Sequence, residues 1–216
     1  MVAQGAKKAT AKVTDSLEEV DLLENLVLIS RSSIPPRELS EYHSLLVTPF
    51  FTAPFPGGSR FGGERDSGVF YCALELATVA AERGYYAQRF FNDSSGFDEP
   101  IQTGHTLFTV AIATDAVDVR IPPFKKKVDI FLDKNNYIPT QAFANLVRST
   151  NVSAIQYSSV RSPNKGICLA LLSPLGFKKK YPLSEDQNWN AIVSGNKVRW
   201  VNSSLLKHEP EMEFGY

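Results

Sequence analysis

A buried strand that leads directly into a long helix is the feature that most constrains this chain. Residues 68–73 are continuously apolar and rich in β-forming side chains, which predicts a short buried strand. Residues 75–91 follow almost at once and have a helical pattern, with Thr78 and Glu82 four residues apart and therefore on one face. A chain of 216 residues built around such a unit predicts a mixed α/β (α+β) fold.

Other helices and strands are expected on both sides of this unit. A capping-box pair and apolar side chains at helical spacing predict a helix over 16–29, which either packs on the core or serves a homodimer. A second helix is predicted to begin at Thr140, as its cap, and to run to about residue 148. Strands are predicted at 43–48, 106–114, 118–121, 153–157, 167–172 and 197–202, with loops at 49–67 and 92–104.

The chain is predicted to divide into three parts. Residues 1–13 are small, polar and basic, and we expect them to be flexible. Residues 14–205 carry the helices and strands of the domain, and residues 206–216 form a short acidic tail. The sequence has no internal repeat and no linker of domain scale, so a single domain is expected.

Composition and charge exclude several classes of protein. Lys+Arg and Asp+Glu are equal at 23 each, and this zero net charge argues against direct nucleic-acid binding. No apolar run approaches the roughly 20 residues that span a bilayer, so no membrane partner is expected. The N-terminus lacks an apolar signal core, and Cys72 and Cys168 lie in apolar stretches, which favours a reducing compartment. We therefore expect a cytoplasmic protein.

Metal chemistry is not expected. The sequence has no phosphate-binding P-loop, no HExxH, no GxSxG and no paired cysteine motif. The three histidines, His43, His105 and His208, are far apart and lack the spacing of metal ligands. Structural or surface positions are the simpler reading of all three.

Arg60 lies in a run that invites a functional reading, Gly-Gly-Ser-Arg-Phe-Gly-Gly at 57–63. Glycines on both sides let the backbone approach a ligand closely, and a guanidinium donates two parallel hydrogen bonds to a phosphate or carboxylate. The plainer alternative is a tight surface loop whose arginine is solvated.

Glu82 and Ser159 are the other two candidates. Glu82 lies in mid-helix among small apolar residues, where its carboxylate either faces solvent or points into a cleft. Ser159 follows a β-like run in Gln-Tyr-Ser-Ser-Val-Arg at 156–161, where the alternative is ordinary hydrogen bonding at a strand end. Taken singly, none of the three decides a function.

Together these pieces resemble the RES domain family. Arg60 in GSRFGG, Glu82 in ALELATVAAE and Ser159 in YSSVR match the Arg, Glu and Ser that give the domain its name. Arg60 to Tyr71 and Tyr71 to Glu82 are each about 11 residues apart, as in the family's pattern. The resemblance covers about residues 13–175, and it is the ordered set of motifs that makes it specific.

The resemblance implies a fold, a substrate and a partner. The fold would be like that of the ADP-ribosyltransferases of the diphtheria-toxin type, with small mixed sheets and flanking helices. The substrate would be NAD⁺, which relatives hydrolyse or phosphorolyse, or from which they transfer ADP-ribose to a protein. The chain would be the toxin of a RES–Xre toxin–antitoxin pair, inhibited by a helix-turn-helix antitoxin that inserts a segment between Arg60, Tyr71 and Glu82.

Within that reading each residue has an expected role. Glu82 would stabilise the positive charge that develops on the ribose as nicotinamide leaves, and Arg60 would bind the pyrophosphate or the adjoining ribose. Tyr71 would stack on nicotinamide, and Ser159 would orient the substrate or Arg60.

One departure from the family favours an alternative. Relatives in this subgroup read Thr-Pro-Phe-Arg-Tyr where this chain has Phe51 and Thr52. The loss of that cation and ring favours a second hypothesis, a non-catalytic binding module that keeps the fold.

Overall fold

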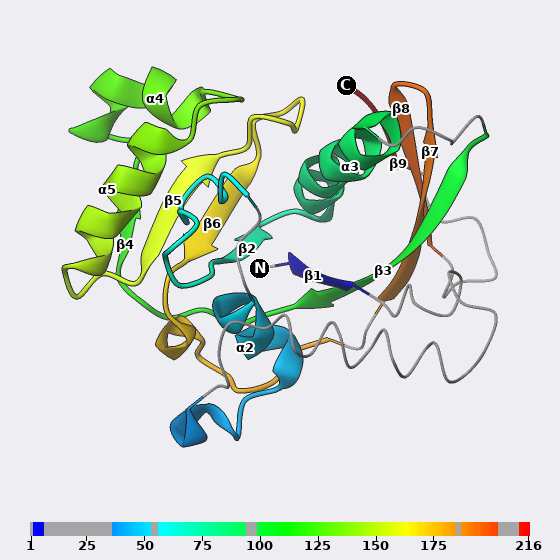
Figure 1. The fold of residues 1–216 in the computed structure, drawn as a ribbon. Coiled ribbons are helices and arrows are strands. Elements are labelled where there is room, and N and C mark those ends of the chain that lie inside the picture. The colour runs from blue at the N-terminus through cyan, green and yellow to red at the C-terminus, as the bar shows by residue number, and fades with distance from the viewer. Residues whose placement is uncertain (1, 7–35, 53–55, 94–98, 185–186, 203–211) are drawn as a thin grey trace.

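The strands form one nine-stranded mixed sheet in the order β4-β5-β6-β2-β1-β3-β7-β8-β9 (Figure 1). The computed structural model describes residues 2–6, 36–52, 56–93, 99–184, 187–202 and 212–216. β4 and β5 run parallel, whereas the other neighbouring pairs of described strands are antiparallel. The strands are β1 (Val2–Ala6), β2 (Phe70–Ala73), β3 (Ile101–Thr109), β4 (Ala116–Asp118), β5 (Ala154–Ser158), β6 (Ile167–Leu171), β7 (Gln187–Ser194), β8 (Lys197–Asn202) and β9 (Met212–Gly215).

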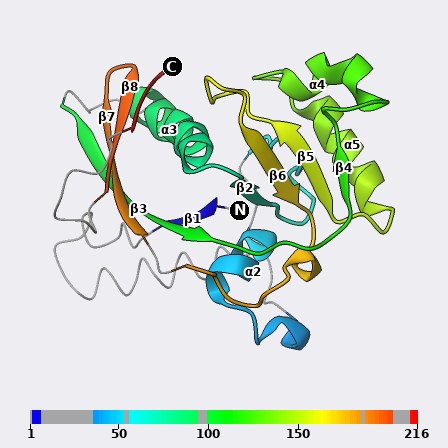
Figure 2. The ribbon, with the colours of Figure 1, turned by 180° about the vertical axis from the view of Figure 1, so that it is seen from behind.

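The sheet divides into two small halves joined through β1. We call β4, β5, β6 and β2 the β2 half, and β3, β7, β8 and β9 the β3 half. β1 pairs with β3 along its whole length but with β2 only at Val2 opposite Ala73. The two halves splay apart on either side of this junction, as Figures 1 and 2 show from opposite sides. The predicted mixed α/β class, with small mixed sheets and flanking helices, is confirmed.

Helices cover both faces of this sheet. The α-helices are α2 (Ser44–Phe51), α3 (Leu76–Asp93), α4 (Val128–Leu132) and α5 (Ile138–Arg148), and 3-10 helices lie at Arg37–Leu39, Phe124–Lys127 and Pro174–Gly176. α3 packs against β7, β8 and β9 and also reaches β1 and β2, so it contacts both halves. α2 packs on β2 and on the 3-10 helix at Pro174–Gly176, whereas α4 packs against α5. In the described ranges, no helix has the length and apolar character needed to cross a bilayer.

The core has two clusters, and β2 separates them by the alternation of its side chains. Ala73 belongs to the cluster that contains Trp189, Trp200 and the buried residues of α5, and Tyr71 packs against that cluster. Phe70 and Cys72 belong to the second cluster, with the buried residues of α2. Successive residues of a strand point to opposite faces, so the first cluster marks the face under α3 and α5 and the second the face under α2.

Several predicted elements are confirmed in type and place. The buried strand at 68–73 is β2, and the helix that follows it is α3. The strands expected at 153–157, 167–172 and 197–202 are β5, β6 and β8, each shifted by at most one residue at either end. The helix predicted over 16–29 and its two packing alternatives lie outside the described residues.

The strand predicted at 43–48 is wrong, because these residues belong to α2. His43 caps that helix, its Nδ1 accepting a hydrogen bond from the Leu45 amide at 3.3 Å. Leu46 and Phe50, four residues apart, are both buried in the second cluster. Pro49 lies inside this helix, near its C-terminal end, and cannot donate a hydrogen bond to the Leu45 carbonyl. Packing at helical spacing therefore outweighs the β-propensity of the run.

The predicted boundaries of several strands are wrong, and some strands were not predicted. β3 begins at Ile101, inside the predicted polar loop, and ends at Thr109, so residues 110–114 are not strand. The strand expected at 118–121 is Ala116–Asp118, and β7 was not predicted at all. Residues 2–6, expected to be flexible, form β1, because β3 offers them a partner along their whole length. Residues 212–215 of the expected tail form β9 beside β8.

Candidate functional site

Glu82 and Ser159 meet although they are 77 residues apart. The Ser159 hydroxyl donates a hydrogen bond to Oε1 of Glu82 at 2.5 Å. Ser159 is only 1% exposed, and its Oγ also accepts hydrogen bonds from the backbone N–H groups of Arg161 (3.2 Å) and Ser162 (2.8 Å). Three bonds therefore fix the hydroxyl, and the hydroxyl in turn fixes one carboxylate oxygen of a half-buried glutamate.

The loop after β5 is seated on α3 at a glycine. The Ser159 amide donates to the Gly166 carbonyl at 2.8 Å, which closes the loop. A Cβ built at Gly166 would lie 1.9 Å from Oγ1 of Thr78, which is one helical turn before Glu82. Only a residue without a side chain fits there. The predicted shared face of Thr78 and Glu82 is confirmed, since both contact this loop.

Arg60 is buried, and part of its guanidinium is bound by main chain. Its side chain is 6% exposed, and Nη1 donates to the carbonyls of Phe131 (2.8 Å) and Asp133 (2.9 Å). The guanidinium carbon lies 4.8 Å from the centroid of the Tyr137 ring, within cation–π range. The alternative of a solvated surface arginine is wrong. Arg60 also holds the segment from 131 to 137 in place.

Three side chains of α5 donate hydrogen bonds to main-chain carbonyls of the Arg60 loop. Thr140, predicted to cap the helix, lies inside it, is fully buried and donates to the Arg60 carbonyl at 2.5 Å. The other two are Gln141, which donates to the carbonyls of Gly57 (2.9 Å) and Ser59 (3.0 Å), and Arg148, which donates to the Phe61 carbonyl at 3.1 Å. Bonds to main chain fix the loop whatever side chains it carries.

Gly58 is required by the conformation of this loop. Its φ is +72°, in the region that favours glycine, and a Cβ there would lie 2.3 Å from the Gly62 carbonyl oxygen. The Ser59 amide donates to that same carbonyl at 2.7 Å. The glycines therefore permit a tight turn that orients Arg60, rather than open space around it.

Tyr71 supports the loop through its hydroxyl. The phenol oxygen lies 2.8 Å from Oγ of Ser59 and accepts a hydrogen bond from the Phe61 amide at 3.0 Å. Burial raises the pKa of Tyr71 to about 12, so the phenol is neutral near pH 7. The Tyr71 hydroxyl is therefore held by one side chain and one main-chain amide of the Arg60 loop.

Two tyrosines that the sequence analysis did not select also belong to the site. Tyr86 is 43% exposed and lies one turn after Glu82 on α3, and the phenol of Tyr137 is close enough to affect that of Tyr86. Burial as the main cause, followed by the Tyr137 phenol and the Glu82 charge, raises the pKa of Tyr86 well above its usual range. The i+4 spacing from Glu82 was the signal that was available for Tyr86. No sequence signal pointed to Tyr137.

The four predicted residues form two linked pairs beside the β2 half. Glu82 and Ser159 are bonded directly, and Arg60 and Tyr71 are joined through the loop. In the described parts of the chain, no hydrogen bond links Arg60 to Glu82. Both act on the same buried neighbour, because the Glu82 charge raises the pKa of Cys168 and the Arg60 charge lowers it, after burial as the main cause.

Phe51 and Thr52, where the chain departs from the family pattern, lie away from the candidate site. Phe51 packs against the second core cluster, on the face under α2. The Thr52 hydroxyl donates to the Thr48 carbonyl at 2.9 Å, one turn back in the same helix. Neither residue contributes a cation or a ring near Glu82.

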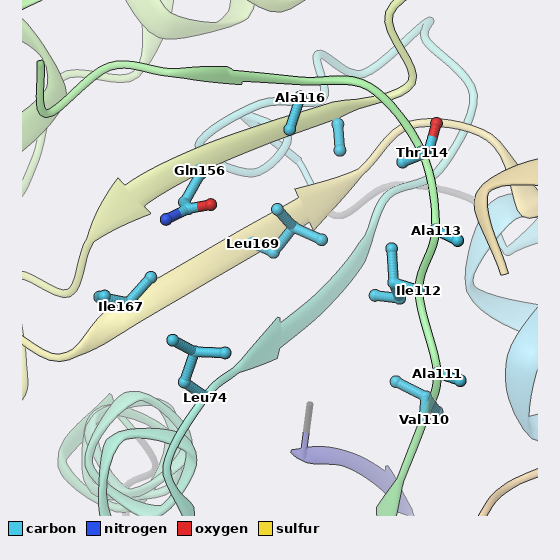
Figure 3. Close-up of a pocket in the computed structure, with 11 residues that line it drawn as sticks. Leu74, Val110, Ala111, Ile112, Ala113, Thr114, Ala116, Gln156, Ile167 and Leu169 are labelled. Carbon is cyan, nitrogen blue, oxygen red and sulfur yellow. The ribbon is translucent and has the colours of Figure 1, made fainter. Parts of the chain in front are cut away.

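A hollow of about 470 Å³ lies on the opposite face of the sheet from the site (Figure 3). Segment 110–116 forms one side, and Gln156, Ile167 and Leu169 project from β5 and β6 on the other. Leu169 belongs to the second cluster, whereas its neighbour Cys168 belongs to the first. The eleven lining residues include no charged side chain, so the hollow offers neither the carboxylate nor the cation of the candidate site.

Within the described residues, no group of three or more His, Cys, Asp and Glu side chains is arranged to hold a metal ion. Cys72 and Cys168 are both buried, and neither forms a disulfide with a described residue. Burial raises the pKa of Cys72 to about 12, so this sulfur is neutral near pH 7.

Comparison with known proteins identifies the family pattern over most of the chain. The family model of the RES domain matches residues 35–193, a range that contains all four predicted site residues. No curated protein sequence matches the chain.

Proposed function

The chain belongs to the RES domain family, and from that premise we propose that it cleaves the bond between nicotinamide and ribose in NAD⁺. RES domains are toxin-like, NAD-utilising domains of the ADP-ribosyltransferase-like class. The observation that carries the proposal is the Glu82 carboxylate held by the buried Ser159 hydroxyl at 2.5 Å. A carboxylate fixed in this way can act on a cationic sugar carbon without first reorganising.

The chemistry needs an anion beside the ribose. When the C1′–N bond breaks, its electron pair leaves with nicotinamide and neutralises the pyridinium, while positive charge develops on the ribose. Glu82 stabilises this charge in the transition state. Among the described residues only its Oε1 has a hydrogen-bond partner, which leaves Oε2 for a ribose hydroxyl. Water or phosphate then adds to C1′ and releases a proton.

Arg60 has two tasks in this proposal. Its Nη1 orders the segment that carries Tyr137, as the two carbonyl bonds require. In the described part of the chain its Nε and Nη2 have no partner, so the rest of the guanidinium can bind the pyrophosphate or the adjoining ribose. Tyr71 then acts as a support of the Arg60 loop rather than as the stacking ring.

The test is NAD⁺ consumption by the purified protein, followed by separation of nicotinamide from NAD⁺. Glu82→Gln keeps the size and the hydrogen-bond acceptor but removes the charge, and turnover is expected to fall ~10²–10³-fold. Glu75→Gln, at an exposed position just before α3, is the matched control and should leave turnover unchanged. Equal turnover in the wild type and Glu82→Gln would overturn the assignment.

The acceptor of ADP-ribose decides between two reactions of the same site. Hydrolysis or phosphorolysis uses water or phosphate, whereas ADP-ribosyl transfer uses a side chain of a bound protein. We favour degradation of NAD⁺. Mass spectrometry of the products, with and without cell extract, should show free ADP-ribose or its phosphate, and a labelled protein instead would indicate transfer.

The second candidate function is a binding module without catalysis. The observation that favours it is Phe51, which packs against the second core cluster at the position where the family resemblance leads us to expect an arginine. It predicts that the wild type consumes no NAD⁺ and that induction leaves growth and NAD⁺ levels unchanged. The fixed Ser159–Glu82 pair favours the enzyme.

We further propose that a helix-turn-helix antitoxin inhibits the enzyme in trans. An unregulated NAD⁺-consuming enzyme would harm its own cell, and zero net charge leaves DNA binding to the partner. The antitoxin would cover Glu82 with an inserted segment. Co-expression with a neighbouring helix-turn-helix protein should yield a stable complex with suppressed NAD⁺ cleavage, and failure to form a complex would remove the toxin–antitoxin reading.

A further inference from the structure

Tyr86 is exposed, yet its ring is packed against a neighbouring ring. Its side chain is 43% exposed, although it lies in mid-helix on α3, one turn after Glu82. The ring of Tyr85 packs against it edge-on, at 5.4 Å between centroids and 76° between planes. The phenol of Tyr137 is close enough to raise the pKa of Tyr86. An exposed ring on a flexible tether loses entropy when a ligand stacks on it, and this ring is already ordered.

The support behind Tyr86 runs back to Arg60. Tyr137 carries the Arg60 guanidinium over its ring at 4.8 Å, and Nη1 of Arg60 holds the Phe131 and Asp133 carbonyls. Tyr137 is thus fixed by a buried cation, and its phenol lies near that of Tyr86. This series of contacts links the Arg60 loop to the part of α3 beside Glu82.

The other aromatic rings near the site are engaged or remote. The hydroxyl of Tyr71 is bound by the Arg60 loop. Tyr85 carries the Arg161 guanidinium at 3.4 Å from its centroid and packs against Tyr216. Phe51 lies in the second core cluster.

We infer that Tyr86 is the ring on which the nicotinamide of NAD⁺ stacks, and that Tyr137 is a positioning residue for it; this inference rests on the proposed NAD⁺ cleavage. The reacting ribose carbon must lie beside Glu82, and nicotinamide is bonded to that carbon. Tyr86 is the exposed ring one helical turn from Glu82, so the leaving group lies against it. A pyridinium is both planar and cationic, and a phenol face attracts it for both reasons.

Kinetics provide the first test. Tyr86→Ala should raise the KM for NAD⁺ and the inhibition constant of nicotinamide roughly 5- to 30-fold, with a smaller change in kcat. Tyr86→Phe keeps the ring and should remain within about threefold of the wild type. Tyr137→Phe removes the neighbouring hydroxyl and should fall between the two. Phe90→Ala is the matched control, since Phe90 is 61% exposed one turn further along α3.

Fluorescence tests stacking without turnover. Tyr86→Trp in the Glu82→Gln background introduces an exposed indole, while Trp189 and Trp200 are at most 2% exposed. Titration with NAD⁺ and with nicotinamide alone should give saturable quenching, and Phe90→Trp in the same background should give none. Quenching by ADP-ribose but not by nicotinamide would overturn the assignment, because adenine would then be the stacked ring.

The two proposals fail in different ways. If the wild type consumes NAD⁺ and depends on Glu82, but Tyr86→Ala keeps the wild-type KM and nicotinamide inhibition, the inference is wrong and the proposed function stands. If the wild type consumes no NAD⁺, the proposed function is wrong, and absence of quenching in the tryptophan variant then overturns the inference as well. Saturable quenching by nicotinamide would still support Tyr86 as a nicotinamide-stacking residue.

Discussion

The two halves of the sheet are held together by different kinds of contact. In the β3 half, β3 pairs with β7 over seven residue pairs, and β7 pairs with β8 over six. β7 and β8 carry the buried side chains Trp189 and Trp200. In the β2 half the strands are three to five residues long. Side chains that form hydrogen bonds with main-chain atoms hold the loops of this half in place. The long ladder serves as a scaffold, and the short strands end in loops that can be shaped around a site.

α3 belongs to both halves and keeps their roles on separate sides. Thr78 and Glu82 face the Ser159 loop of the β2 half. Gly84 faces the β3 half, where a Cβ would meet Val198 and Trp200 at 3.4 Å. The scaffold therefore sets the position of the helix, and the loops set the chemistry on its other side. This division predicts that changes in the β3 half alter stability alone, whereas changes in the β2 half alter activity, with or without a loss of stability.

The largest effect is expected from Trp200→Ala in the β3 half. Trp200 is fully buried in the first core cluster, so truncation leaves a large cavity and should lower the free energy of unfolding by about 3–5 kcal/mol. Urea unfolding measures this loss. The kcat of the fraction that remains folded, assayed at low temperature, should stay within about threefold of the wild type.

Trp200→Phe serves as the milder variant if the alanine variant does not fold. It keeps most of the apolar volume and should lose less stability, again without loss of kcat. A tenfold fall in kcat for folded Trp200→Phe would break the comparison, because the scaffold would then transmit its packing to Glu82.

A pH-dependent loss of stability should also come from the β3 half. His105 is buried against Trp200, at 4.9 Å between rings, and its Nε2 lies 2.9 Å from the Thr103 hydroxyl. Burial, with the Arg83 charge as the second cause, lowers the pKa of His105 to about 4. Below its usual pKa of about 6.5, His105 binds a proton in the unfolded chain but not in the folded chain. Stability therefore falls as the pH drops towards 4.

The expected size is up to about 3 kcal/mol, lost between pH 6.5 and 4 and constant below that. Urea unfolding at pH 7 and pH 4.5 should show a larger loss in the wild type than in His105→Gln. The carboxylates titrate in both proteins, so only the difference between them reports His105. Identical pH dependence in the two proteins would show that the ring is protonated as easily in the fold as in water.

The elements that could be predicted from sequence are those with a local pattern of their own. β2 and α3 follow from a continuous apolar run and a helical repeat. β6 is another short apolar run, and β5 and β8 are short β-prone runs that include polar residues. α2 could not be predicted, because its β-prone residues become helical only when Leu46 and Phe50 pack together in the second cluster. β1 forms where β3 provides a partner, and its sequence contains no such information.

The same distinction applies to the site. Glu82 and Ser159 were recognised from the sequence motifs alone, and the structure adds the hydrogen bond between them. The bonds of Arg60 to the Phe131 and Asp133 carbonyls could not be predicted, because they join segments more than 70 residues apart through main-chain atoms that any residue has. Tyr137 was missed for that reason, since its place depends on Arg60.

Ser159→Ala should show that polar contacts in the β2 half serve both stability and activity. The change leaves the Arg161 and Ser162 amides without their acceptor and frees Glu82, so unfolding should cost about 1–3 kcal/mol less. Turnover of NAD⁺ should fall roughly 10- to 100-fold, less than in Glu82→Gln, because the carboxylate remains. Ser158→Ala, at the neighbouring half-buried serine, is the control. Equal effects of the two serine changes would contradict the role of the pair.

The smallest effect, and the sharpest test of the division, is expected from a pair of glutamines. Gln141 donates from α5 to the Gly57 and Ser59 carbonyls behind Arg60, whereas Gln102 is exposed on β3. Gln141→Ala should lower the free energy of unfolding by about 1 kcal/mol, the usual net contribution of such bonds. Because the loop that carries Arg60 then has more conformations to lose on binding, the KM for NAD⁺ should rise a few-fold with little change in kcat. Gln102→Ala should change neither quantity. A rise in KM for Gln102→Ala as large as for Gln141→Ala would mean that the β3 half also shapes the site.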